Sequence, residues 1–202
     1  MRMNLKDRAV DLLPWAIAMC LIAAIVHLVT VLLIPAVAPR DAYARLIEAA
    51  KSAQDAPGGV LLLSAAEAGG VAPLPFEDPA MAEGVCLFNL SNGLLHVRAN
   101  VDGEEDNFLG LSFHSAGGAI FHAMTDRASI KGKIDVILGN ARQIEELEAD
   151  DGDEAPPEEI RITAPSLRGF VLIRSLAKRP SDLARARAAV ASVNCEAIAP
   201  PP

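Results

Sequence analysis

The first part of the chain contains one uninterrupted run of apolar positions. No Asp, Glu, Lys or Arg occurs between residues 12 and 39. A helix rises about 1.5 Å per residue, so roughly 20 residues cross the ~30 Å hydrocarbon layer of a bilayer, and residues 15–34 supply that length. The run therefore predicts one transmembrane helix over residues 12–38, which starts near Asp11 and Pro14 and ends near Pro35.

The end of this run raises the question of cleavage, because Ala36-Val37-Ala38 resembles a signal-peptidase site. The apolar run is longer than the ~7–15-residue core of a signal peptide, and Pro39 directly follows the cut. We therefore predict an uncleaved signal anchor. Basic residues flank it almost equally on both sides, and the free amino group favours a cytoplasmic N-terminus, residues 1–11, with the following domain in the periplasm.

Five residues of the run share one helical face: Cys20, Ala23, Ala24, His27 and Thr30. Small residues beside a polar group favour helix–helix contacts in lipid. This face is predicted to meet a partner helix, with His27 as an interhelical hydrogen-bonding group. A neutral His27 that bonds its own helix or a lipid headgroup explains the pattern equally well.

After the anchor the pattern changes to short alternating segments. Residues 41–54 predict an amphipathic helix, and Gly, Pro and Ala dominate the rest of a connector over 39–84. The strands predicted from apolar alternation are 60–63, 85–90, 94–99, 107–114, 119–124, 133–138, 160–164 and 170–176.

Turn signals join these strands into hairpins. Asn92-Gly93 predicts a hairpin between 85–90 and 94–99, and Ala-Gly-Gly at 116–118 predicts the next one. The last two strands are predicted to form a final hairpin around 165–169. Together the strands predict a mainly antiparallel β domain, sandwich or jelly-roll-like.

Two further helices are predicted to flank this domain. Asn140 and Gln143 match a capping box that opens a helix through about residue 149, before an acidic loop over 150–159. The last helix starts near Ser181, and its core-facing stripe is Leu183, Ala186, Val190 and Val193. The chain is thus predicted to be an α+β protein with one N-terminal transmembrane helix, a β-rich domain over 85–196 and a frayed tail over 197–202.

Composition narrows the function classes. Of the 202 residues 51% are hydrophobic, which is too apolar for a disordered chain. The formal net charge is -8, whereas a nucleic-acid-binding protein needs a basic face. Aromatic residues make up 4%, which leaves little to stack on bases. We therefore expect no nucleic-acid partner.

Three histidines of the predicted domain, His96, His114 and His122, are candidate metal ligands. A two- or four-residue loop after His114 places it and His122 on opposite sheet faces. A three-residue loop places His122 opposite Gly110 and leaves His114 about 13 Å further along the strand. Neither register lets both bind one ion, so no metal site is predicted.

Other chemistry-bearing residues form no recognisable catalytic motif. The acidic segment at 150–154 fails as an EF-hand because Leu147 would occupy its first ligand position. The serines that lack a G-x-S-x-G elbow are Ser64, Ser91, Ser112 and Ser115. We predict no catalytic residue and no cofactor.

The chain has three cysteines, and two of them lie in the predicted β domain. Cys86 lies in an apolar strand, and Cys195 follows the last helix. Two cysteines of one small domain often pair in an oxidising compartment, so a Cys86–Cys195 disulfide is predicted. Two separately buried thiols are the alternative.

A series of short motifs runs through nearly the whole chain. They are Ile25-Val26-His27-Leu28, Asp41-Ala42-Tyr43-Ala44-Arg45-Leu46, Pro75-Phe76-Glu77-Asp78-Pro79, Val85-Cys86-Leu87-Phe88-Asn89-Leu90-Ser91, Leu95-His96-Val97-Arg98, Thr125-Asp126-Arg127-Ala128 and Arg168-Gly169-Phe170-Val171-Leu172, with Cys195 near the end. In this order they resemble the domain of unknown function 1254 family, in its short membrane-anchored bacterial form.

The resemblance implies a bacterial inner-membrane protein without an established reaction. In larger relatives this domain is commonly followed by the domain of unknown function 1214, which the sequence lacks. The favoured hypothesis is therefore an envelope interaction subunit beside a second membrane-anchored chain that carries this companion domain, with a homodimer as runner-up. The alternative is a periplasmic enzyme or small-ligand binder that uses His96, His114 or His122 with an acid such as Asp126.

Overall fold

The computed structural model describes residues 5–37, 41–52, 57–64, 74, 78–91, 93–101, 108–151 and 158–199. The chain divides into two compact units, Met1–Asp41 and Ala42–Pro202. Several predicted features lie outside the described residues: Pro39, Asn92, most of the connector, the acidic residues 152–157 and the last three residues of the tail.

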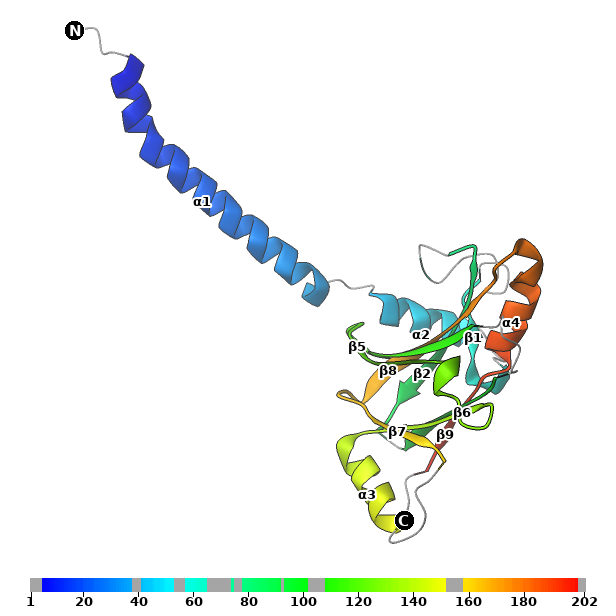
Figure 1. The fold of residues 1–202 in the computed structure, drawn as a ribbon. Helices are drawn as coiled ribbons and strands as arrows, with labels where there is room; N and C mark the ends of the chain where they lie inside the picture. The colour runs from blue at the N-terminus through cyan, green and yellow to red at the C-terminus, as the bar shows by residue number, and fades with distance from the viewer. Residues whose placement is uncertain are drawn as a thin grey trace. The chain divides into compact units, whose positions relative to one another are not determined.

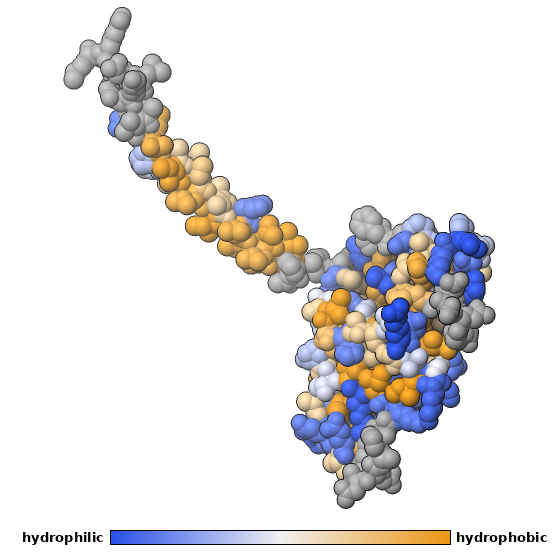
Figure 2. Space-filling model, viewed as in Figure 1, coloured by the Kyte–Doolittle hydropathy of each residue, from blue (hydrophilic) through white to orange (hydrophobic). Residues whose placement is uncertain are grey.

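The first unit is one helix, α1, from Leu5 to Val37. Its stretch Asp11–Ile34 is long and apolar enough to cross a membrane, with a mean hydropathy of 2.9, and Figure 2 shows apolar residues along α1. The helix begins before Asp11 and Pro14, so the predicted start was wrong. Proline lacks the N–H for one helical hydrogen bond, and this 33-residue helix continues through Pro14 despite that loss.

The second unit is a β-sandwich with helices on its outside (Figure 1). A five-stranded sheet has the order β1-β2-β8-β4-β5, and a four-stranded sheet has the order β7-β6-β3-β9. The strands are β1 (Leu61–Leu62), β2 (Met81–Asn89), β3 (Leu94–Asn100), β4 (Leu109–Ser115), β5 (Ile120–Thr125), β6 (Lys133–Gly139), β7 (Ile160–Thr163), β8 (Arg168–Leu176) and β9 (Asn194–Ile198). The predicted mainly antiparallel α+β class is confirmed; the parallel pair is β6–β7.

Two predicted hairpins were wrong. Strands β2 and β3 belong to different sheets, and so do β7 and β8. The turn that contains Gly93 carries the chain from one sheet to the other, and a Cβ at Gly93 would overlap the carbonyl oxygen of Ile198. Glycine is therefore required here by a close approach of two backbones, which gives the same sequence signal as a hairpin turn.

The core lies between the two sheets, where alternate residues of each strand meet. Val97 and Val136 of the four-stranded sheet and Phe113, Val171 and Ile173 of the five-stranded sheet are fully buried in one cluster. This alternation is the expected signature of strands with one face in a sandwich core.

One helix covers the outer face of each sheet, and a third helix packs into the core cluster between the sheets (Figure 1). Helix α2 (Ala42–Ser52) packs Leu46 against Val85 and Phe170 of the five-stranded sheet. Helix α3 (Ala141–Asp151) packs Ile144 against Ile137 of the four-stranded sheet. Helix α4 (Leu183–Ala191) packs against β2 and β8. The remaining elements are the short 3-10 helices η1 (Pro57–Gly59), η2 (Asp126–Ala128) and η3 (Pro180–Asp182).

The predicted stripe of the last helix and the capping box are both present. Ala186 and Val190 are buried in the main core cluster. The backbone N–H of Gln143 donates to Asn140 Oδ1 at 3.0 Å, and the N–H of Asn140 donates to Gln143 Oε1 at 2.9 Å. Helix α3, which this capping box opens, continues to Asp151, two residues past its predicted end.

Strand β9 is an element that the sequence pattern missed. It pairs antiparallel with β3 and takes in Ala197 and Ile198, which were predicted to belong to a frayed tail. Within β9, Cys195 faces the core and forms a disulfide with Cys86 of β2, at a Cα–Cα distance of 6.3 Å. This bond joins the two sheets across the core.

Candidate functional site

The predicted partner face lies on α1. Cys20, the free cysteine of the described chain, is exposed there. The hydroxyl of Thr30 donates to the carbonyl oxygen of Val26 at 2.7 Å, so its hydrogen-bonding capacity is met partly within its own helix. His27, one turn earlier, has no hydrogen-bond partner among the described residues and is the polar group of this face that remains to be satisfied.

His96 lies on the outer face of the four-stranded sheet. Its Nε2 is 2.6 Å from Asp135 Oδ1, on the neighbouring strand β6. On the same face Arg98 pairs with Glu196 of β9 at 3.0 Å. The acid beside His96 is therefore Asp135, whereas the Asp126 of the sequence hypothesis opens η2 after β5.

His114 lies on the outer face of the five-stranded sheet, in a ring stack. Its imidazole lies 4.5 Å from the ring of Phe170 at an interplanar angle of 9°, and Phe170 stacks in turn on Tyr43 of α2 at 6.4 Å. Burial lowers the pKa of His114 below its usual value of 6.5, and the nearby positive charge of Arg174 lowers it further, although the hydrogen bond to Gly118 acts in the opposite direction. The ring is therefore neutral at neutral pH.

The neutral ring of His114 contacts a serine. Ser112 Oγ lies 2.9 Å from His114 Nε2, and His114 Nδ1 lies 3.3 Å from the carbonyl oxygen of Gly118. A carbonyl can only accept, so this contact assigns the proton to Nδ1 and leaves Nε2 to accept from the serine hydroxyl. This is the proton arrangement of a serine activated by a histidine base.

His122 belongs to the opposite face of the same sheet. It pairs in register with Phe113, not with Gly110 as the three-residue-loop alternative required, and its ring meets Phe113 edge-on at 5.9 Å. His114 pairs with Ile120 beyond a bulge. The three histidines therefore occupy three separate surfaces, and no cluster of metal-ligating side chains occurs among the described residues.

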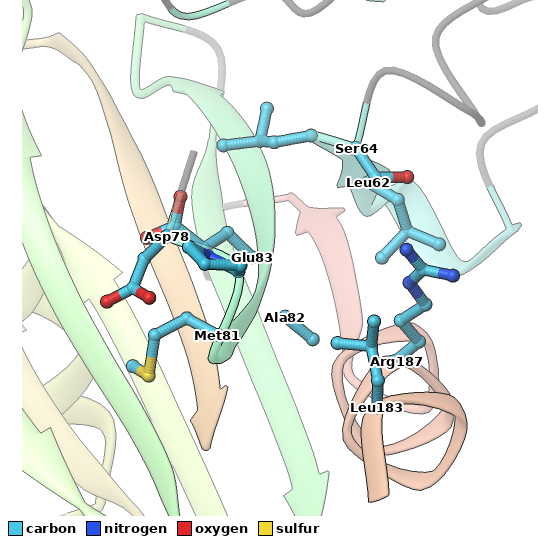
Figure 3. Close-up of a pocket in the computed structure, with 10 residues that line it drawn as sticks. Leu62, Ser64, Asp78, Met81, Ala82, Glu83, Leu183 and Arg187 are labelled. Carbon is cyan, nitrogen blue, oxygen red and sulfur yellow. The ribbon is translucent and has the colours of Figure 1, made fainter. Parts of the chain in front are cut away.

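A small pocket of about 190 Å³ lies where the start of β2, the end of β1 and helix α4 meet (Figure 3). Leu62, Ala82 and Leu183 supply apolar walls. Figure 3 shows Arg187 rising from α4 on one side, while Asp78 and Met81 lie on the other. No histidine lines this pocket.

The charges of this pocket differ in how they are satisfied. Asp78 Oδ1 accepts the backbone N–H of Ala80 at 2.9 Å. Glu83 forms an ion pair with Arg174 at 2.9 Å. Arg187 is partly buried and has no hydrogen-bond or ion-pair partner in the described part of the chain.

Sequence reasoning missed both the Ser112–His114 contact and Arg187. Ser112 was dismissed for lack of a G-x-S-x-G elbow. Ser112 and His114 are two residues apart on one strand, however, and this spacing places both side chains on the same face of the sheet. That spacing is visible in the sequence. Arg187 gives no local signal, because its surroundings come from segments more than 100 residues away along the chain, a separation that the sequence pattern cannot bridge.

Comparisons with known proteins give little further information. No family model matches the chain, and no curated protein matches it. Among solved structures, it is similar to the VPA0106 protein from Vibrio parahaemolyticus, with 14% identity and a TM-score of 0.47 over 61% of this chain and 29% of that one. An uncharacterized protein from Burkholderia cenocepacia shows 11% identity and a TM-score of 0.44 over 75% of this chain and 38% of that one. The chain thus spans 29% and 38% of the length of these two structures.

Proposed function

We propose that this protein is an interaction subunit of the bacterial cell envelope, anchored in the inner membrane by α1. Its N-terminus is cytoplasmic, and its β-sandwich lies in the periplasm. It is a short form of the domain of unknown function 1254 family and works beside a second membrane-anchored chain that carries the domain of unknown function 1214.

The observation that carries this proposal is the edge strand β5, whose outer side pairs with no other strand among the described residues. This strand pairs with β4 on one side and ends the five-stranded sheet on the other. None of its six residues is Asp, Glu, Lys or Arg, and Ile120 is 62% exposed. Edge strands are usually protected by charge or proline, because an open edge pairs with another chain. An added strand of a partner would satisfy this edge.

The disulfide supports the periplasmic position. Disulfides such as Cys86–Cys195 form and persist in oxidising compartments and are rare in the cytosol. The apolar stretch Asp11–Ile34 supports anchoring, and His27 on its exposed face supports a contact between helices in the bilayer.

The test is co-purification of the tagged full-length chain from its native membrane in mild detergent, with mass spectrometry of the associated chains. A chain with the companion domain is the expected partner. Ile120→Lys places a charge on the β5 edge and should abolish co-purification of the partner. Lys133→Glu, on β6 of the other sheet, should leave co-purification unchanged. Crosslinking through Cys20 distinguishes a homodimer, which would replace the proposed partner. Recovery of a monomer alone would contradict the proposal.

A second candidate is a periplasmic hydrolase, and the Ser112–His114 contact is the observation that favours it. The Ser112 hydroxyl would attack an ester carbonyl while its proton passes to His114 Nε2, and His114 would then protonate the leaving alcohol, which leaves an acyl ester on Ser112. Water, deprotonated by His114 Nε2, would attack this ester, and the acid would leave as Ser112 takes the proton back from His114. A fluorophosphonate probe tests this role. Labelling of the wild-type chain that is lost in Ser112→Ala and His114→Gln supports it, and equal labelling of wild type and Ser112→Ala contradicts it.

A further inference from the structure

We propose that the pocket between β2 and α4 binds a small aliphatic carboxylate, with Arg187 as the residue that holds the carboxylate group. The proposal concerns a surface separate from the β5 edge and from the Ser112–His114 contact.

Partly burying Arg187 carries a cost in free energy. Among the described arginines, Arg161 and Arg187 are partly buried, and the others whose burial is described are exposed. Arg161 is paired with Glu159 at 2.9 Å. Arg187 has no such partner in the described chain. Removing a guanidinium from water without a counter-charge is unfavourable, and a bound anion would remove that cost.

Asp78 and Glu83, the two acidic residues in the described lining of the pocket, each contact a group other than Arg187. Arg174 neutralises Glu83, and the backbone turn before β2 uses Asp78 Oδ1. Figure 3 shows the guanidinium of Arg187 extended toward Leu62 and Ser64, away from Asp78. A guanidinium binds carboxylates and phosphates through two parallel hydrogen bonds, and the apolar walls of this pocket fit a carboxylate on an aliphatic chain.

The pocket also limits the size and polarity of a ligand. Leu183, one turn before Arg187 on α4, and Ala82 and Met81 of β2 supply apolar walls. A cavity of about 150 Å³ by the same measure holds benzene, a six-carbon molecule. The 190 Å³ pocket therefore has room for a chain of about six carbons. Hexanoate combines this tail with the anionic group that Arg187 requires.

The experiment uses the full-length chain in lipid nanodiscs and saturation-transfer NMR with hexanoate. Empty nanodiscs correct for partition of hexanoate into lipid. We expect signal transfer to the aliphatic protons, saturable with hexanoate concentration. Hexanol, which has the same tail and no charge, should bind at least tenfold more weakly, because the charged hydrogen bonds are absent. Absence of saturable transfer above the empty-nanodisc level, or equal binding of hexanol, overturns the proposal.

Matched variants on one helix assign the binding to Arg187. Arg187→Gln should weaken hexanoate binding roughly tenfold to a hundredfold, and Arg187→Lys should have an intermediate effect because it keeps the charge and loses the two-bond geometry. Arg185→Gln removes an exposed arginine that pairs with Asp182, outside the pocket, and should leave binding unchanged. Circular dichroism confirms folding of each variant. Unchanged affinity in folded Arg187→Gln overturns the proposal.

Discussion

Gln143 shows how a residue of the capping box also connects two parts of the fold. Beyond its exchange with Asn140, its side-chain amide donates to the carbonyl oxygens of Leu90 and Gly93, both at 3.1 Å. The Gln143 side chain thus makes three hydrogen bonds, to Asn140, Leu90 and Gly93. Because this side chain is buried, water does not replace these bonds when it is removed. It thereby fixes the turn between the sheets to the start of α3.

We therefore expect Gln143→Met to lower the free energy of unfolding by about 1–3 kcal/mol, since buried backbone groups lose their partners. Arg142→Met is the matched control, because Arg142 is exposed at the preceding position and, among the described residues, pairs only with Glu146 on its own helix. It should change stability by less than about 0.5 kcal/mol. Urea unfolding followed by circular dichroism measures both, and equal effects would show that the bridge from α3 to the turn adds no stability.

His114 should make the stability of the domain depend on pH. Its pKa is lower in the folded chain than the usual 6.5, so the unfolded chain binds the proton more readily. Stability from this group is complete above pH 6.5 and is lost as pH falls below it. Between about pH 7.5 and about pH 5.5 the melting temperature of the wild type should fall more steeply than that of His114→Gln. Parallel slopes would contradict this.

At the scale of elements, alternation of apolar residues located most strands, but not their assignment to sheets. Burial alternates clearly in β3 and β4, where one face is buried. Strands β2, β6 and β8 contain continuous buried runs because helices cover part of their outer faces. A turn signal such as Gly93 is local, however, and the same glycine serves a hairpin or a crossing between sheets. Strand β9 was missed because it has only five residues and its positions on the core side are the small residues Cys195 and Ala197.

The disulfide belongs to this scale because it ties β9 to β2. The cysteines are separated by 109 residues, so in the chain-entropy model the bond stabilises by up to ~4–5 kcal/mol, and ~2–4 kcal/mol is the typical measured range. Reduction should lower the urea midpoint of the full chain accordingly and slow its mobility in denaturing electrophoresis. The Cys20→Ser variant, which lacks the exposed thiol, should respond to reduction as the wild type does. An unchanged mobility would show that the two cysteines are not joined.

At the scale of the whole molecule, the sequence predicted an anchor and a β domain because both depend on long hydrophobic patterns. The small pocket and the ring stack of Tyr43, Phe170 and His114 depend instead on residues from three separate segments. Such sites arise only from tertiary packing, which no local pattern reports.

The purified protein should begin at or near Met1 and should sediment with membranes. The reason is the apolar stretch Asp11–Ile34, which is longer than a cleavable signal core, together with Pro39 after the small residues. Intact mass spectrometry and carbonate extraction of membranes measure these properties. A mature species that begins near residue 39 would contradict the anchor, and a reduced Cys86–Cys195 pair in the native cell would contradict the periplasmic orientation.

The long separation of the two cysteines also imposes an order on biogenesis. Cys86 lies on the second strand, whereas Cys195 is synthesised 109 residues later, on the strand that completes the four-stranded sheet. If the domain is exported as proposed above, the thiol of Cys86 cannot pair with Cys195 until the strands between them have emerged. In that interval it is open to a mixed disulfide with a thiol oxidoreductase, and closure onto Cys195 can follow only once β9 has arrived. The Cys86–Cys195 disulfide can therefore form only in chains whose synthesis has passed β9.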